Sequence, residues 1–189
     1  GDYERALGYD VLYPVPFQLN DVFYDPHCNV EGHFTDATLY AERNWGAGFP
    51  LRWWWGQAHD FDGADVSVAF SGGLLELGPL RRDVAGVVVR LGRKVIRLTP
   101  PMPVRSVIGD NYWSIRARSP RYQIELEGDG TALPPHVLPV PLPADRRNVD
   151  TDFEHLGGVL HCTVKESGRV IFSGTSHLAG LEVGSRPPG

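Results

Sequence analysis

Alternation of apolar and polar residues is the feature that most restricts the fold of this chain. A period of two is typical of β-strands with one buried face. The clearest examples are residues 112–118, 122–127, 159–164 and 170–178. Turn sequences separate such segments, and the 22 Gly and 16 Pro leave no long stretch with helical spacing. The pattern therefore predicts an all-β, antiparallel fold of roughly ten strands with little helix.

Turn and proline positions sharpen this prediction. Residues 84–91 and 94–98 flank a Gly92-Arg93 turn, which is the clearest hairpin in the chain. Two proline-rich stretches, residues 99–103 and 133–143, lack the backbone donors that a central strand needs. We expect both stretches to be loops or edge segments.

Composition excludes several functional classes. The net charge of -5 argues against a nucleic-acid partner. No run approaches the about 20 apolar residues that cross a bilayer, so we predict a cytoplasmic protein and leave open a peripheral membrane contact. Cys28 and Cys162 are too few for a disulfide framework and are expected to be reduced. Histidine spacing indicates no metal site, and without a phosphate-binding loop we expect no cofactor.

The segment of residues 40–61 is the most unusual part of the sequence, because it holds four of the five Trp. On a strand that starts at Leu51, one face would carry Trp53, Trp55, Gln57 and His59. The other would carry Arg52, Trp54, Gly56 and Asp60. An aromatic face with two polar side chains is typical of a binding-cavity wall. It is equally compatible with an ordinary packed core, and the pattern alone leaves both interpretations open.

This segment resembles the signature of the tocopherol cyclase family. The matching positions are Tyr40, Glu42, Arg43, Asn44, Trp45, Gly46, Gly48, Phe49, Pro50, Trp53, Trp55 and Gln57. Further matches are Gly72-Gly73, Tyr112-Trp113 and residues 176–184. The resemblance implies a lipocalin-like β-barrel over residues 38–184, preceded by a segment, residues 1–37, that contributes strands or an edge. Residues 185–189 would form a tail.

Two departures from the family pattern are visible. Arg43 stands where the plant-type pattern has Lys, which keeps the charge and changes the geometry. Family members are also longer, with a preceding half that contributes strands and part of the cavity. The chain is therefore either a reduced homologue or one piece of a longer protein. Its 16 Arg against two Lys are typical of a high-GC, bacterial genome.

The resemblance implies a cofactor-independent cyclase or isomerase that closes a ring on a lipophilic prenylated phenol or another polyene. Trp53 and Trp55 would stabilise a carbocation through their ring faces. A carboxylic acid must deliver the proton, and Glu42 and Asp60 are the candidates. We prefer Glu42 because it lies in the matched motif, although it would serve equally well as a structural ion pair at a barrel rim.

Other side chains would assist proton transfer and substrate binding. His59 would relay or accept a proton, and Gln57 would orient the phenol oxygen. The remaining substrate-binding candidates are Tyr40, Asn44, Trp45, Tyr112 and Trp113. Related lipocalin-like proteins include carotenoid hydratases and natural-product cyclases, and fold alone does not choose among their reactions.

Two other interpretations remain. In the first, the barrel is a non-catalytic carrier of a hydrophobic isoprenoid or pigment. In the second, its aromatic wall is a packed core without a cavity. An ionisable group among the aromatic side chains favours the enzyme, whereas a wholly apolar lining favours the carrier. A homodimer that completes the cavity is also left open.

Overall fold

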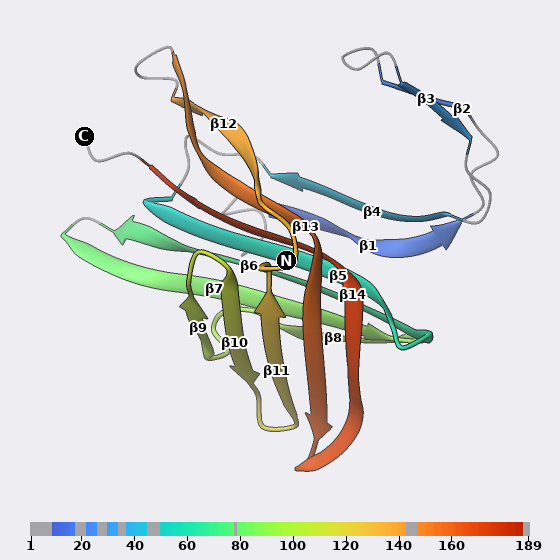
Figure 1. The fold of residues 1–189 in the computed structure, drawn as a ribbon. Helices are drawn as coiled ribbons and strands as arrows, with labels where there is room; N and C mark the ends of the chain where they lie inside the picture. Colours follow the sequence, from blue (N-terminus) through green and yellow to red (C-terminus); the bar gives the residue numbers. More distant parts are fainter. Residues whose placement is uncertain are drawn as a thin grey trace. The chain divides into compact units, whose positions relative to one another are not determined.

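The computed structural model describes residues 9–17, 22–25, 30–33, 37–44, 50–77, 79–142 and 147–186. Within these ranges every regular element is a strand, which confirms the predicted all-β class. The chain divides into two compact units, Gly1–Trp45 and Gly46–Gly189. Each unit is described by itself below (Figure 1).

The first unit contains two small antiparallel pairs. β1 (Tyr9–Phe17) pairs with β4 (Ala37–Asn44), and β2 (Val22–Asp25) pairs with β3 (Val30–His33). The predicted boundary between residues 37 and 38 lies at the start of β4, within this unit.

The second unit is one ten-stranded sheet. Its strands are β5 (Arg52–Phe61), β6 (Ala64–Leu77), β7 (Leu80–Leu91), β8 (Lys94–Leu98), β9 (Val104–Ile108), β10 (Tyr112–Arg118), β11 (Tyr122–Asp129), β12 (His136–Leu142), β13 (Arg147–Glu166) and β14 (Arg169–Ser185). Their order is β8-β7-β6-β5-β14-β13-β11-β10-β9, with β12 added beside β13 and every pair antiparallel. Among the described residues the sheet ends on β8 and β9 and is not closed.

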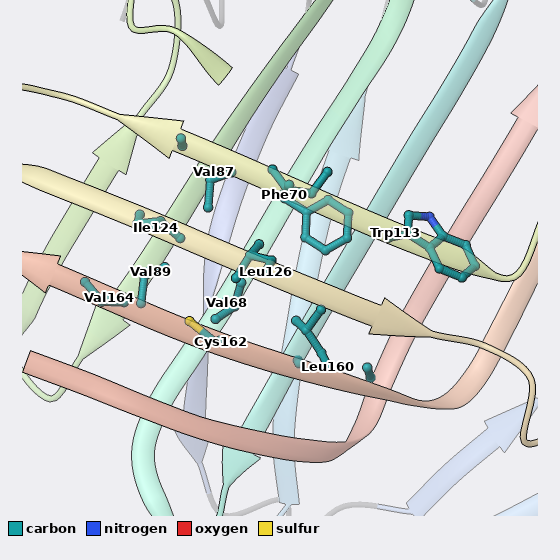
Figure 2. Close-up of a cluster of buried hydrophobic side chains, with 14 of the residues drawn as sticks. Val68, Phe70, Val87, Val89, Trp113, Ile124, Leu126, Leu160, Cys162 and Val164 are labelled. Atoms are coloured by element: carbon teal, nitrogen blue, oxygen red, sulfur yellow. The ribbon is translucent and has the colours of Figure 1, made fainter. Parts of the chain in front are cut away.

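The sheet is bent so that one of its faces encloses a single apolar core. In Figure 2 the strand that carries Ile124 and Leu126, β11, runs across the strand that carries Val68 and Phe70, β6. All four side chains are at most 1% exposed, so this part of the interior is filled by side chains. Cys162 lies in the same core with a free thiol whose pKa burial raises to about 12, whereas Cys28 lies outside the described residues. We call the face that encloses this core the inner face.

Turn residues behave as their types predict. Gly63, Gly92 and Gly168 adopt positive φ in the hairpin turns, a conformation that glycine reaches without steric cost. Among the described strands, the proline-containing β12 has β13 as its one partner, at the edge of the sheet. This position tolerates the missing backbone donors of Pro139 and Pro141.

The two longest strands bring distant parts of the sequence together. β13 pairs with β12 over its first part and with β11 over its last part, and Gly157 between these parts has a φ of 75°. β14 lies beside β13, and its last residues, from Gly180 to Ser185, also pair with β5. Ser185, the first residue of the predicted tail, is thus part of the sheet. The C-terminal end of β14 therefore lies between β5 and β13.

β5 shows the predicted alternation of faces. Trp54 and Ala58 point into the core, which makes the odd-numbered positions from Trp53 to His59 part of the opposite, outer face. The alternation breaks at Asp60, which has a φ of 58° at an irregularity in the pairing with β6. Phe61 therefore points into the core.

Candidate functional site

Two carboxyl groups lie close together on the outer face, where β5, β14 and β13 run side by side. Glu182 of β14 is aligned with Trp55 on one side and with Glu154 on the other. The next outer position, Gly184, is aligned with Trp53 and Asp152. Directly opposed residues of antiparallel strands share one face, so this register groups the acids with the aromatic side chains.

Hydrogen bonds join three of these side chains. The Trp53 indole Nε1 donates to Glu182 Oε1 at 2.8 Å. The Asp152 carboxyl interacts with both the Glu182 carboxyl and the Trp53 indole. Trp53 is 6% exposed and Asp152 is 8% exposed, while Glu182 is half-buried. We call Trp53, Asp152 and Glu182 the carboxyl site.

Burial sets the protonation of this site. Removal from water raises the pKa of Glu182 to about 8, and the negative charge of Asp152 acts in the same direction. Burial likewise raises the pKa of Asp152. Two buried carboxyls in contact do not both ionise, so the pair keeps a proton near neutral pH. The carboxyl site can therefore act as a general acid in an aromatic surrounding.

Two glycines leave room for the indoles beside Glu182. A Cβ atom on Gly184 would lie 2.1 Å from ring atoms of Trp53, so the indole rests directly on the β14 backbone. At Gly180 a Cβ atom would meet Gln57 at 3.4 Å and Trp55 at 3.5 Å, which is ordinary contact distance. Glycine at position 184 is therefore needed to hold Trp53 within reach of Glu182.

The backbone of Glu182 is fixed from the inner face. Trp113 is fully buried in the core, and its Nε1 donates to the Glu182 carbonyl at 3.0 Å. The Trp113 ring in turn meets His155 edge to face, with centroids 5.4 Å apart. His155 is 2% exposed and its Nδ1 bonds to the Gly130 carbonyl at 2.9 Å. Core packing thus positions the strand from which the acid projects.

The aromatic face predicted from the sequence borders this site. Trp53, Trp55, Gln57 and His59 all belong to the outer face of β5. Gln57 Oε1 and His59 Nδ1 are buried atoms without a hydrogen-bond partner among the described residues. The predicted roles of these side chains in substrate binding and proton transfer stay predictions.

Other predicted residues lie away from the carboxyl site. Asp60 is exposed at the irregularity of β5. Tyr112 is 46% exposed, and its hydroxyl donates to Glu127. Trp113 is a core residue that reaches Glu182 only through the backbone carbonyl. Their predicted roles stay predictions too.

The positions matched at the start of the signature belong mostly to β4. Tyr40, Glu42 and Asn44 lie on this strand, and their side chains are outside the described part of the structure. Trp45 lies outside the described residues altogether. Glu42 therefore stays a predicted proton donor.

Sequence reasoning missed both carboxyls of the site. Glu182 lies within residues 176–184, which we matched to the family signature, and it alternates with the apolar Leu181 and Val183. A lone acid at such a position was a usable signal. Asp152 offered none, because only the register of β13 against β14 brings it beside Glu182.

Comparison with known proteins adds independent information. The family model described as tocopherol cyclase-like matches residues 29–185. A probable chloroplastic tocopherol cyclase of Oryza sativa subsp. japonica is 30% identical over 169 residues, which cover 82% of this chain and 35% of the rice protein. The chloroplastic tocopherol cyclase of Zea mays is 29% identical over 198 residues, which cover 87% of this chain and 40% of the maize protein. The chain thus spans well under half the length of these relatives.

One solved structure is also similar. The crystal structure of kievitone hydratase from Nectria haematococca matches with a TM-score of 0.46 and 14% identity, over 82% of this chain and 46% of that protein. No helix in the described part of the chain is long and apolar enough to cross a membrane. The cytoplasmic location, the membrane contact and the homodimer stay predictions, and the two plant relatives are described as chloroplastic.

Proposed function

Because this chain belongs to the tocopherol cyclase-like family, we propose that it is a cyclase of the isomerase type. It would close a ring on a lipophilic prenylated phenol or a related polyene without a cofactor. The observation that supports this proposal is the half-buried Glu182 carboxyl, which lies against the Trp53 indole and the Asp152 carboxyl and whose pKa burial raises to about 8. An ionisable group among aromatic side chains favours an enzyme over a passive carrier.

The proposed reaction starts with proton transfer. Glu182 gives its proton to one carbon of a trisubstituted alkene, and the other carbon becomes a tertiary carbocation. Trp53 and Trp55 present aromatic rings on either side of Glu182. Each ring face would stabilise the cation by about 1–2 kcal/mol in a desolvated site. The substrate's own oxygen then attacks the cation and closes the ring.

Neighbouring polar atoms would orient the substrate. Gln57 Oε1 is an unpaired buried acceptor on the same face, two residues along β5 from Trp55. It would accept a hydrogen bond from a hydroxyl group of the substrate that does not take part in ring closure. His59 Nδ1 lies further along the same face and would serve as a second polar contact.

The test combines binding with product analysis. The chain is titrated with a prenylated hydroquinone while Trp fluorescence is followed, and the same sample is analysed by mass and chromatographic retention. We expect quenching and a product of unchanged mass with a new retention time. In Glu182→Gln, turnover should fall at least about 100-fold, because the amide has no acidic proton. Binding should stay within a few-fold.

A matched control removes an exposed carboxyl from the same strand. Asp150 of β13 is exposed and lies two residues before Asp152. Asp150→Asn should retain wild-type turnover. Quenching by the wild-type chain without any product would favour a carrier, and full turnover in Glu182→Gln would remove this residue from the mechanism.

A further inference from the structure

One carboxyl oxygen of Asp152 takes no part in the hydrogen bonds of the carboxyl site. The residue is 8% exposed, and its carboxyl interacts with Glu182, with the Trp53 indole and with the backbone amide of Phe153. Nevertheless its Oδ1 is a buried atom without a hydrogen-bond partner among the described residues. Buried acceptors in proteins are nearly always paired, because an unpaired one loses hydration without compensation.

The surroundings of this oxygen are acidic on one side and apolar on the other. The ionisable groups that influence the Asp152 carboxyl are Glu182 and Glu154, both of them acids. On the adjoining edge strand the directly opposed residue is Leu138, which is apolar and 37% exposed. A lipophilic substrate, which carries no cation, would meet this oxygen with an O–H group while its apolar body lies against Leu138.

We propose that Asp152 binds the hydroxyl group of the substrate and accepts its proton when the ring closes. This inference rests on the proposed cyclase function and assigns the second half of its proton transfer. It also restricts the substrate class to alkenes that carry a free hydroxyl, because an ether has no proton to give.

The proton that Glu182 gives up is replaced by the proton that Asp152 accepts. The Glu182 O–H bond breaks as a C–H bond forms on the alkene, and the substrate oxygen forms the new C–O bond to the carbocation. The O–H bond of that oxygen then breaks, and its proton passes to Asp152. Because the two carboxyls are in contact, the proton can return from Asp152 to Glu182. Nothing is oxidised or reduced, and the product is an isomer of the substrate.

The first experiment measures binding alone. Trp fluorescence is titrated with ortho-geranylphenol and with its methyl ether, which differ by the hydroxyl proton and one methyl group. Wild-type protein should bind the phenol about tenfold more tightly than the ether, as expected for a hydrogen bond to a charged acceptor. Asp152→Val should bind both ligands within about twofold of each other, because the acceptor is gone. The matched control Asp150→Val should keep the wild-type preference.

The second experiment separates proton transfer from folding. Asp152→Asn keeps the shape of the side chain but is not a base, so phenol binding should stay within a few-fold while turnover falls about 100-fold. Thermal melting establishes that each variant is folded. If Asp152→Val does not fold, the turnover of Asp152→Asn decides the question.

The outcomes distinguish this inference from the proposed function. A preference for the phenol that is lost in Asp152→Val supports the hydroxyl site even if no product forms, and in that case the cyclase activity is what fails. Product formation by the wild-type chain, combined with an unchanged preference in Asp152→Val or full turnover in Asp152→Asn, overturns the role of Asp152. The absence of any preference in the wild-type protein overturns it as well.

Discussion

Two glutamates on the two longest strands show opposite electrostatic behaviour. Glu166, at the end of β13, accepts hydrogen bonds from Lys94 at 2.8 Å and from Arg121 at 2.7 Å, and these cations lower its pKa to about 2. Glu182, near the end of β14, has an indole and a second carboxyl as neighbours, and burial raises its pKa to about 8. The difference shows that surroundings decide which carboxyl can give up a proton at neutral pH.

The same comparison separates structural from chemical roles. Glu166 joins the start of β8 to the β10–β11 turn, and Tyr122 also donates to it at 3.1 Å. Lys94, Arg121 and Tyr122 all stabilise the ionised form of Glu166, so this cluster links the end of β13 to β8 and to the β10–β11 turn. The groups that shift the pKa of Glu182 are two carboxyls, those of Asp152 and Glu154, and the Trp53 indole. The protonated form of Glu182 is a proton donor that the fold partly removes from water.

The largest effect is expected from the core residue behind Glu182. Trp113→Ala removes a fully buried side chain and the hydrogen bond to the Glu182 carbonyl. The free energy of unfolding should fall by about 3–5 kcal/mol in urea denaturation. Tyr112→Ala, at the 46% exposed neighbour, should cost much less. Similar losses in both variants would show that the core does not support the carboxyl site.

Two glycine substitutions test how closely the Trp53 indole is held. In Gly184→Ala the new Cβ would lie 2.1 Å from the ring, whereas in Gly180→Ala the nearest side-chain atom is 3.4 Å away. Gly184→Ala should therefore destabilise the protein by about 1–3 kcal/mol in thermal or urea unfolding. Gly180→Ala should cost less than that. Equal effects would mean that the indole does not rest on residue 184.

The dependence of stability on pH should differ between Glu182→Gln and the wild type. The unfolded chain loses the Glu182 proton near pH 4.5, but the folded chain keeps it up to about pH 8. The folded state thus binds more protons in this window, and the contribution of Glu182 to stability decreases as the pH rises through it. Glu182→Gln should lack this decrease, which amounts to a few kcal/mol in chemical unfolding. An unchanged slope in the mutant would contradict the raised pKa.

Glu166→Gln should show the opposite and smallest effect. The lowered pKa of Glu166 means that its stabilisation is present above about pH 4.5 and is lost as the pH falls toward about 2. The mutant should be less stable than the wild type at neutral pH and equal to it near pH 2. Added salt should reduce the difference, because these charges lie at the surface. A difference that persists in strong acid would exclude the ion pairs as its cause.

Local patterns predicted much of the fold. Residues 112–118 were predicted as one strand from alternation, and β10 has the same bounds. The hairpin of residues 84–91 and 94–98 corresponds to β7 and β8, where a glycine turn joins two alternating segments. The lengths of β13 and β14 were not predictable in this way. The partner change of β13 near Gly157 depends on pairings with strands far away in the sequence.

The candidate site was predictable only in part, for a related reason. The face shared by Trp53 and Trp55 follows from alternation within a single strand. The proximity of the Glu182 and Asp152 carboxyls depends on the register between β13 and β14, which no local pattern specifies. The desolvation that raises the pKa of Glu182 depends in turn on this register.

The most direct test of the account is the titration of Glu182 itself. Carboxyl carbon NMR of glutamate-labelled protein follows this group, and Glu182→Gln identifies its signal. We expect a midpoint near pH 8, far above the ordinary value of 4.5. A midpoint near 4.5 would show that Glu182 is ionised at neutral pH and would remove the proton donor on which the proposed function rests.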